Sequence, residues 1–414
     1  GKLVKEILEK DFGLDWLDNY FDKIKLTFDK KEFKTKKTNL DVLKHICAYI
    51  KSKGFRYLDE DIANYYLSLK SKPFAILAGI SGTGKTQLAI KFAEAIENDL
   101  KLVPVRPDWT DNSDLIGYVD LRGKFKKKTF LESIVEADLN SEKIYFVVLD
   151  EMNLARVEHY FSDFLSIIET RDETGRSQHP ILSDSEVGEL GEEDKGLYNL
   201  RIPDNLYIIG TVNMDETTHP FSRKVLDRAN SIEMNQINLE WIDAGKEIEP
   251  INGVYNDFLK GKYIFSKDFK EKDKKDLVTT IKLLTALNDV LKAADLQFGY
   301  RVRDEVCFYM LNRREIASII SEEAALDFQV MQKILPRIQG SSFRIRSIIL
   351  EILKLLNSDN EKLKAIDIKN NQINSVELES IVNDIEDLKF QRSTDKLLFM
   401  FRRFEEDGFT SFWL

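Results

Sequence analysis

Five short apolar runs of strand length lie between residues 70 and 240, and stretches with helical periodicity separate them. Apolar runs of this length predict strands that are buried on both faces, as in a parallel sheet covered by helices. The predicted strands are 74–79, 102–105, 144–151, 206–213 and 231–234. The expected fold class is therefore α/β, with a five-stranded parallel sheet between helices.

The periodicity is helical before residue 70 and again after residue 240. Apolar positions three and four residues apart predict helices over 40–51 and 59–70. Beyond residue 240 the pattern predicts helices only, and residues 357–376 are polar enough to form a loop. The predicted helices of this region are 277–291, 302–311, 324–338, 343–356 and 394–406.

These changes of pattern divide the chain into four parts. A helical lead-in (1–70) precedes a large α/β domain (71–238), and a helical lid (239–356) precedes a C-terminal loop and helix (357–414). Within the α/β domain, residues 115–130 predict a hairpin that turns at 121–124. One helix is expected over 154–168, and the acidic stretch 172–200 predicts a surface insertion.

Composition narrows the class of protein. The chain has 414 residues, of which 43% are hydrophobic and 32% charged, so a globular protein of several domains is expected. Its formal charge of −10 argues against a broad basic surface that coats nucleic acid. Cys47 and Cys307 lie in apolar helical patterns and are expected to be reduced core thiols. The absence of a spanning apolar run predicts a soluble, cytoplasmic protein without membrane contact.

The first strand leads into a glycine-rich turn and then a helix, predicted from Gln87 to about Glu97. The turn has the pattern Gly-x-x-x-x-Gly-Lys-Thr, in which backbone N–H groups cradle phosphate oxygens at the start of a helix. Lys85 is expected to reach the β- and γ-phosphates, and the Thr86 hydroxyl to bind Mg²⁺. The predicted phosphate-binding residues are Gly79, Ile80, Ser81, Gly82, Thr83, Gly84, Lys85, Thr86 and Gln87.

Polar side chains end two later strands of the same predicted sheet. Asp150 and Glu151 follow the third strand, and Asn213 ends the fourth. Ligands of open α/β sheets bind at the carboxyl ends of the strands. Asp150 is therefore predicted to hold the Mg²⁺ shell, Glu151 to polarise the attacking water, and Asn213 to bind that water or the γ-phosphate. Taken in isolation, an asparagine at this position would more often be a turn former.

Two further features have open interpretations. The aromatic turn from Phe55 to Tyr57 precedes the first strand and could line a base pocket or belong to the core. The basic hairpin segment, Lys124 with Lys126, Lys127 and Lys128, could be a solvated tip or could face a pore or a partner.

Several stretches together resemble the McrB family of AAA+ NTPases, the motors of modification-dependent restriction systems. The AAA+ pattern covers about residues 70 to 350. The stretches that carry the narrower resemblance are Leu-Ala-Gly-Ile-Ser-Gly-Thr-Gly-Lys-Thr (77–86), Val-Leu-Asp-Glu-Met-Asn-Leu-Ala-Arg-Val-Glu (148–158), Gly-Thr-Val-Asn-Met-Asp (210–215), Gly-Tyr-Arg-Val-Arg-Asp-Glu-Val (299–306) and Asp-Gly-Phe-Thr-Ser-Phe-Trp (407–413).

The resemblance implies a homo-hexameric ring with nucleotide and Mg²⁺ between subunits. Its catalytic arginine finger maps to Arg228, with Arg223 as the alternative, and a surface ion pair is the other interpretation of Arg228. The lid arginine that senses γ-phosphate maps to Arg301, or else Arg303. GTP rather than ATP is implied by the family, since nothing in the phosphate loop selects a base.

The resemblance also implies DNA translocation and a separate McrC-like endonuclease subunit. The chain shows no nuclease pattern and no DNA-reading module before residue 70, so cleavage by this chain alone is not expected. It begins at Gly1 rather than Met, which is compatible with removal of an upstream piece. The family motif Met-Asn-x-x-Asp-Arg differs here, because Thr217 stands in place of the arginine and Glu216 in place of the acid.

Two other functions compete with this assignment. One is an ATP-driven machine of the MoxR or dynein type that remodels proteins rather than moving DNA. The other is a nucleotide-gated scaffold with negligible hydrolysis, which the paired acids and Arg228 disfavour.

Overall fold

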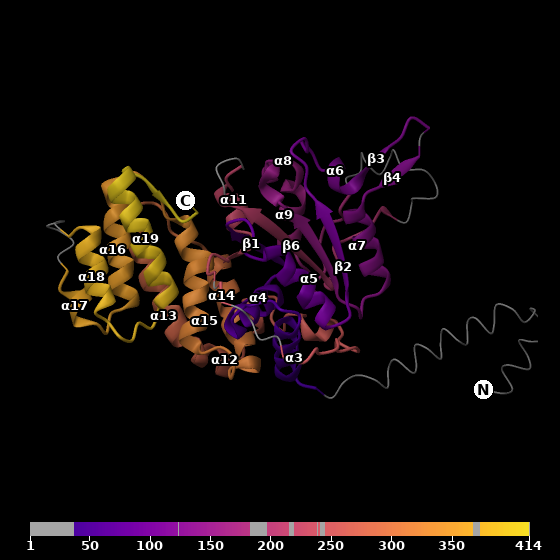
Figure 1. Cartoon of the computed structure of the whole chain (residues 1–414). Coiled ribbons are helices and arrows are strands. Elements are labelled where there is room, and N and C mark those ends of the chain that lie inside the picture. Colours follow the sequence, from indigo (N-terminus) through magenta and orange to yellow (C-terminus); the bar gives the residue numbers. More distant parts are fainter. Residues whose placement is uncertain are drawn as a thin grey trace, which may run out of the picture.

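The computed structural model describes residues 37–122, 124–182, 197–214, 219–237, 239–240, 245–366 and 373–413. A five-stranded sheet forms its centre, and the strands stand in the order β2-β5-β6-β1-β7, all parallel to their neighbours (Figure 1). This confirms the predicted fold class. The strands are β1 (Phe74–Gly79), β2 (Asp99–Pro104), β5 (Tyr145–Asp150), β6 (Leu206–Asn213) and β7 (Asn230–Glu233).

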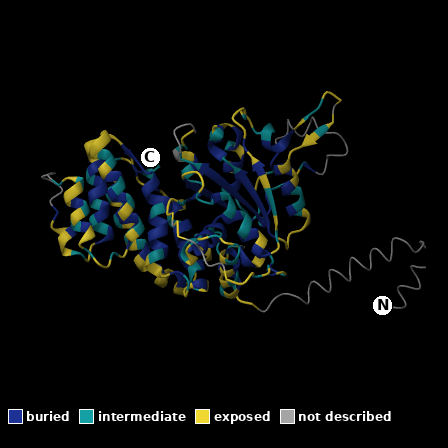
Figure 2. Cartoon of the chain, in the orientation of Figure 1, coloured by how far each residue is buried: buried dark blue, intermediate teal, exposed yellow. Residues whose placement is uncertain are grey.

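Helices cover both faces of the sheet. Alternate residues of β1 point to opposite sides, so Ala75 and Leu77 pack with α5 (Lys85–Ala95) and Ile76 packs with α7 (Thr129–Leu139). The strands β1, β5, β6 and β7 are almost entirely buried, and Figure 2 shows them mainly in dark blue, whereas the edge strand β2 is largely accessible, contrary to the expectation of burial on both faces. The second face also receives α8 (Val157–Tyr160) and α9 (Ser162–Glu169), which form two helices where one was predicted.

The lead-in consists of α3 (Asn39–Ser52) and α4 (Asp59–Ser71) in the described part of the chain. A capping box between Thr38 and Asp41 starts α3. The buried Asn64 of α4 accepts hydrogen bonds from Tyr309 (2.8 Å) and Gln332 (2.6 Å) of the lid. The lead-in is thus packed between the sheet and the lid.

The predicted hairpin is present. Short α6 (Ser113–Ile116) leads into β3 (Gly117–Val119), which pairs antiparallel with β4 (Phe125–Lys127) and extends away from the sheet (Figure 1). Gly117 has φ 130°, and an added Cβ would lie 2.1 Å from the carbonyl oxygen of Lys126. Only glycine fits this position.

The second half of the chain is mainly helical. Its helices are α12 (Glu271–Asp276), α13 (Val278–Lys292), α14 (Tyr300–Arg313), α15 (Glu322–Gln329), α16 (Phe343–Leu356), α17 (Glu361–Lys364), α18 (Ser375–Asn383) and α19 (Gln391–Asp407). Among the helices of the described segments, none has both the length and the apolar character that a bilayer span requires. Cys47 and Cys307 are buried free thiols, as expected.

Three expectations for this half are wrong. The region is not purely helical, because β8 (Gln339–Gly340) pairs antiparallel with β9 (Thr410–Ser411). The helix predicted over 324–338 ends as α15, and a π-helical turn and a 3₁₀ turn follow it, the latter with Pro336 in its first turn. The polar stretch predicted as a loop contains α17 and the start of α18.

A buried ion cluster joins the lid to the amino-terminal end of the sheet. Glu305 of α14 binds Lys72, just before β1, and Lys333, with 2.5 Å between the charged atoms in each pair. Lys333 also donates to the carbonyl of Ala229, just before β7. This cluster fixes α14 against the base of the sheet.

Candidate active site

The glycine-rich turn lies between β1 and α5 at the carboxyl edge of the sheet. Gly82 and Gly84 have φ values of 83° and 85°, which are left-handed conformations that glycine adopts without strain. An added Cβ at Gly79 would lie 2.6 Å from the carbonyl oxygen of Met234. The loop therefore needs glycine at each of these positions, and it ends at the first turn of α5, where Thr86 and Gln87 lie.

Lys85 folds back over the loop that precedes it. Its ammonium group donates to the carbonyls of Gly79 (3.0 Å) and Ile80 (2.7 Å). Burial lowers the pKa of Lys85, while the carboxylates of Asp150 and Glu151 act in the opposite direction. A cation held in this way can transfer its hydrogen bonds to phosphate oxygens in the same loop.

Asp150 ends β5 within reach of two hydroxyl groups. Its Oδ1 accepts from Thr86 Oγ1 and from Thr211 Oγ1, both at 2.7 Å. Thr211 also accepts a hydrogen bond from the backbone N–H of Glu151 at 2.9 Å. Sequence reasoning missed Thr211, although its position two residues before Asn213 on β6 places it on the same face of the strand.

Glu151 and Asn213 meet at the ends of neighbouring strands. The Asn213 amide donates to Oε1 of Glu151 at 2.9 Å. Glu151 has φ 53°, an uncommon left-handed conformation for a non-glycine residue, which marks a functional or constrained position. The amide of Asn153 donates to the carbonyl of Asn213 at 3.0 Å and fixes the two loops together. The structure brings these predicted residues to one place.

The residues present fit a magnesium–nucleotide complex. The described residues contain no group of three or more histidine, cysteine and acidic side chains that could hold a metal by themselves. The oxygens of Thr86 and Asp150 lie side by side next to the phosphate loop. Mg²⁺ in phosphate-binding sites takes one or two protein oxygens and fills its shell with phosphate and water. Thr86 and Asp150 are such a pair.

Tyr57, which belongs to the lead-in, forms a hydrogen bond to the phosphate loop. Its hydroxyl donates to the carbonyl of Gly84 at 2.8 Å, and its ring is stacked with that of Phe55, with centroids 6.4 Å apart. An added Cβ at Gly84 would lie 2.5 Å from the tyrosine oxygen. The aromatic turn is therefore adjacent to the loop, and a role in base binding stays a prediction.

Ile80 of the phosphate loop is hydrogen-bonded to a side chain that follows β7. The backbone N–H of Ile80 donates to Oδ1 of Asn235 (3.0 Å), and the Asn235 amide donates to Glu233 (2.6 Å). Glu233 forms an ion pair with Lys396 of α19 at 2.7 Å. This chain of contacts, the Ile80–Lys396 relay, links the phosphate loop to the C-terminal helix. Asn235 follows β7 without a recognisable motif, so sequence reasoning could not identify it.

The two arginines predicted for the site, Arg228 and Arg301, both pair with Glu169. Arg228 pairs with Glu169 at 3.2 Å, and Arg301 pairs with the same carboxylate oxygen at 2.5 Å. Arg301 lines a cavity with Leu69 and Pro73, at the amino end of β1, whereas the phosphate loop follows its carboxyl end. The strand between them is six residues long, which is about 20 Å. Arg301 therefore does not reach the phosphate loop of its own chain, and its predicted sensing role would require a neighbouring chain.

The two alternative arginines lie on α14 and α11 (Arg223–Leu226). Arg303 lies on α14, where it pairs with Asp304 at 2.6 Å and covers the ring of Tyr300. Arg223 is the first residue of α11. The family difference at Glu216 and Thr217 lies outside the described residues.

Comparison with known proteins assigns the α/β domain. Residues 75–229 match the family described as AAA domain (dynein-related subfamily), and residues 247–409 match a domain of unknown function (DUF8727). A curated relative, Neuron navigator 3 from Danio rerio, is 24% identical over 234 residues, which are 55% of this chain and 8% of the relative. A crystal structure of a candidate ATPase from Cytophaga hutchinsonii has a TM-score of 0.46 and 16% identity, covering 76% of this chain and 90% of the other.

Residues 75–229 thus form an AAA+ P-loop domain that matches the dynein-related subfamily. The chain joins this domain to a mainly helical segment whose family has no assigned function. It spans less than a tenth of the curated relative named above.

Proposed function

We propose that this chain hydrolyses a nucleoside triphosphate with Mg²⁺ and acts as the motor of a ring-shaped assembly. The observation that carries the proposal is the convergence of Thr86, Asp150, Glu151 and Asn213 beside the phosphate loop. The four side chains come from α5, β5 and β6, and hydrogen bonds fix them in two pairs. This donor set is suited to in-line attack of water on a γ-phosphate.

Each side chain has a distinct task in the proposed reaction. Lys85 binds the β- and γ-phosphate oxygens, and Thr86 and Asp150 position Mg²⁺, which neutralises phosphate charge when bound. The Glu151 carboxylate orients the attacking water and accepts its proton. Asn213 holds that carboxylate by its 2.9 Å hydrogen bond, which limits the directions in which Glu151 can point.

A neighbouring subunit would complete the site. Arg228 belongs to no hydrogen-bonded group at its own phosphate loop and instead contacts Ser166 (3.1 Å) and Glu169. Its side chain keeps 25% of its surface accessible, so it can contact another chain. An arginine supplied from a neighbour stabilises the charge of the transferring phosphoryl group and makes hydrolysis depend on assembly.

The McrB resemblance supports a narrower version of this function. In that version the ring is a homo-hexamer that prefers GTP over ATP. It drives DNA translocation together with a McrC-like endonuclease subunit, and DNA contacts come mainly from an upstream domain or from the assembled complex. The supporting observations are the five ordered sequence motifs, including the aromatic end of the chain at 407–413.

A second candidate function is ATP-driven remodelling of a protein substrate. The match of residues 75–229 to the dynein-related subfamily supports it as much as the DNA motor, because that match does not separate DNA motors from protein remodellers. The same catalytic residues would serve both functions. The two differ only in the base that is bound and in the polymer that stimulates turnover.

Steady-state phosphate release separates these functions. The chain is assayed with GTP and with ATP, with and without double-stranded DNA, at concentrations where it forms rings. Preference for GTP together with DNA stimulation supports the McrB-type motor. Preference for ATP without DNA stimulation supports the remodeller. Absence of Mg²⁺-dependent turnover with both nucleotides would overturn the proposal of hydrolysis itself.

A further inference from the structure

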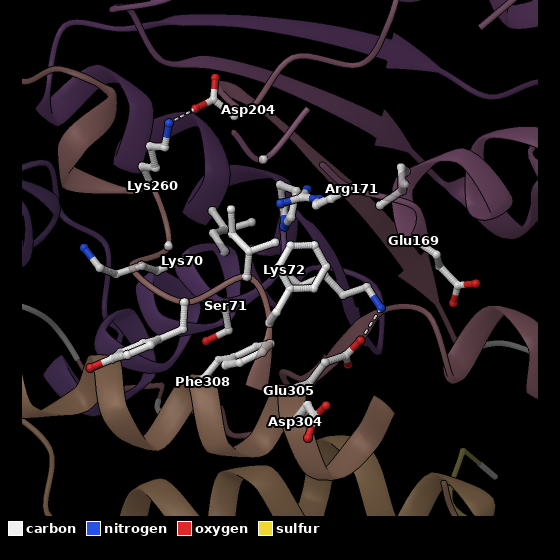
Figure 3. A pocket seen from close by; sticks show the side chains of 18 of the residues that line it. Lys70, Ser71, Lys72, Glu169, Arg171, Asp204, Lys260, Asp304, Glu305 and Phe308 are labelled. Atoms are coloured by element: carbon white, nitrogen blue, oxygen red, sulfur yellow. Dashed lines mark hydrogen bonds and ion pairs between the residues drawn. The ribbon is translucent and has the colours of Figure 1, made fainter. Parts of the chain in front are cut away.

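A cavity of about 420 Å³ lies at the amino-terminal edge of the sheet, away from the phosphate loop. Its walls come from the segment before β1, the end of α9, the loop 259–266 and α14, so it lies between the α/β domain and the lid (Figure 3). The volume is in the range of small-molecule sites. The rings of Tyr263, Phe265 and Phe308 contribute apolar surface.

The ionic side chains of the cavity are almost all paired with one another or with close neighbours. Lys72 binds Glu305, Lys260 binds Asp204, and Arg301 binds Glu169, each with 2.5 Å between charged atoms. Four pairs extend beyond the lining: Lys70 with Glu315 (3.3 Å), Arg303 with Asp304 (2.6 Å), Lys333 with Glu305 (2.5 Å) and Arg228 with Glu169 (3.2 Å). The lining holds five cations and four carboxylates. Among the lining residues alone, cations therefore exceed carboxylates by one, and one lining cation has no carboxylate partner.

That cation is Arg171. Within the described part of the chain its guanidinium has no ion pair and no hydrogen bond, and Figure 3 draws it without a dashed line while Lys72 and Lys260 are joined to their carboxylates. Burial lowers the pKa of Arg171 to about 10, with Tyr207, Asp204 and Glu305 opposing this effect from a distance. An arginine removed from water normally has a bidentate partner.

The backbone that carries Arg171 is rigidly held. Its carbonyl accepts from the Gln178 side chain at 2.8 Å, and Arg171 forms an isolated antiparallel bridge with Ser177. Asp172 closes the turn by accepting from the backbone of Thr174 at 2.8 Å. The guanidinium is thus presented from a fixed turn, which lowers the entropy cost of binding a partner.

We propose that this cavity binds a small organic anion, and that Arg171 holds its carboxylate or phosphate group. The guanidinium offers two parallel N–H donors, which match the paired oxygens of either group. The aromatic rings would cover the apolar body of the ligand, and the ligand charge would balance the unpaired cation. The site is separate from the nucleotide site, because β1 lies between them.

Binding is tested by calorimetry on the full chain with benzoate and phenyl phosphate, and with benzyl alcohol as the neutral control. The P-loop must be disabled, because it also binds phosphate groups, so wild type is compared with Lys85→Ala. Arg171→Gln removes the proposed ligand-binding charge. Arg176→Gln is the matched control, since Arg176 lies in the same turn, pairs with Asp138 and does not line the cavity.

We expect at least one of the two anions to bind saturably to wild type, Lys85→Ala and Arg176→Gln, and benzyl alcohol not to bind. Affinity should fall at least about tenfold in Arg171→Gln, because a charge-assisted bidentate contact is lost. The affinity of Arg171→Lys, which keeps the charge but lacks the two parallel N–H donors, should be intermediate. Equal affinity in Arg171→Gln, loss of binding in Lys85→Ala, or no saturable binding of either anion would overturn the proposal.

Stability of the ligand-free chain provides a second test. A half-buried cation without a partner has lost part of its hydration without compensation, so Arg171→Met should leave the midpoint of urea unfolding unchanged or raise it. Lys72→Met is the comparison, because it removes a paired cation from the same cavity and should lower the midpoint. If Arg171→Met lowers the midpoint as much as Lys72→Met does, Arg171 is a structural residue and the proposal is wrong.

Discussion

The side-chain amide of Asn213 donates a hydrogen bond to the carboxylate of Glu151, with 2.9 Å between Nδ2 and Oε1. The two residues end neighbouring strands, β6 and β5. The contact therefore orients the Glu151 carboxylate. A general base that is already oriented loses little entropy in the transition state.

Glu151→Gln should abolish turnover without abolishing nucleotide binding. The amide of glutamine can still accept from Asn213 but cannot take a proton, so the rate of phosphate release should fall about 10²–10⁴-fold. Binding of a fluorescent nucleotide should change little. Glu136→Gln, which alters an exposed partner of Lys101, is the control and should behave as wild type. Turnover within a few-fold of wild type in Glu151→Gln would exclude Glu151 as the base.

Thr211→Val should weaken magnesium-dependent activity. Thr211 donates to Asp150 and accepts from the Glu151 N–H, so valine leaves that N–H unpaired and Asp150 less fixed. We expect a loss of about 1–3 kcal/mol in unfolding free energy. The Mg²⁺ concentration for half-maximal activity should rise about 10–100-fold, as for other residues that orient metal ligands. Thr211→Ser should restore both, and failure of serine to do so would contradict this role.

Arg228→Ala should reduce turnover about 10³-fold or more if Arg228 acts on the nucleotide of a neighbour. Mixing the inactive Arg228→Ala and Glu151→Gln chains tests this directly. Some interfaces in a mixed ring pair an intact Glu151 with an intact Arg228, so part of the activity should return. Arg402→Ala, which removes an exposed partner of Glu379, is the control. No recovery on mixing would place Arg228 outside the neighbour's site.

Glu305→Gln should destabilise the protein in a pH-dependent way. Burial raises the pKa of Glu305, but the charges of Lys333 and Lys72 outweigh it and hold the pKa below its usual value. A carboxyl group with a lowered pKa contributes stability above its unfolded pKa, and this contribution is lost as pH falls through the folded pKa. Removing the shared carboxylate should cost about 3–5 kcal/mol at pH 7. Urea unfolding at pH 7 and at pH 4 measures the difference in unfolding free energy between wild type and Glu305→Gln. This difference should be smaller at pH 4, and an equal difference at both pH values would contradict the prediction.

Asn235→Ala should weaken nucleotide binding about 2–10-fold, because the Ile80 N–H loses a hydrogen bond that orients the phosphate loop. Lys396→Met should act in the same direction through Glu233. Equilibrium binding of a fluorescent nucleotide measures both. Lys362→Met, which removes an exposed partner of Asp384, should leave affinity unchanged. Wild-type affinity in both test variants would show that the relay does not position the loop.

The sheet and the phosphate loop were predictable because their signals are local. The apolar run 74–79 and the glycines after it determine a buried strand and a left-handed turn within a few residues, and strand ends at Asp150 and Asn213 follow from parallel pairing. The pairing of β8 with β9 was not predictable in this way. Each strand has two residues, and Gln339 and Ser411 are far apart in the sequence, so no periodicity marks them.

The contacts of the arginines could not be predicted from local sequence signals either. The sequence places Arg228 and Arg301 on separate elements, and only the packing of α14 against the base of the sheet brings both to Glu169. Arg171 likewise carries no motif. Its significance comes from an ion-pair balance among residues from several segments, and such a balance depends on the folded structure alone.

The Ile80–Lys396 relay has a thermodynamic consequence for the whole chain. It crosses from the segment 75–229 into the segment 247–409, so the first amide of the phosphate loop and the position of α19 are energetically linked. Linkage is reciprocal: anything that draws α19 away from Glu233 must lower nucleotide affinity, and nucleotide must resist that movement by the same free energy. The position of α19, in a segment of unassigned function, would then depend on whether nucleotide is bound at the phosphate loop.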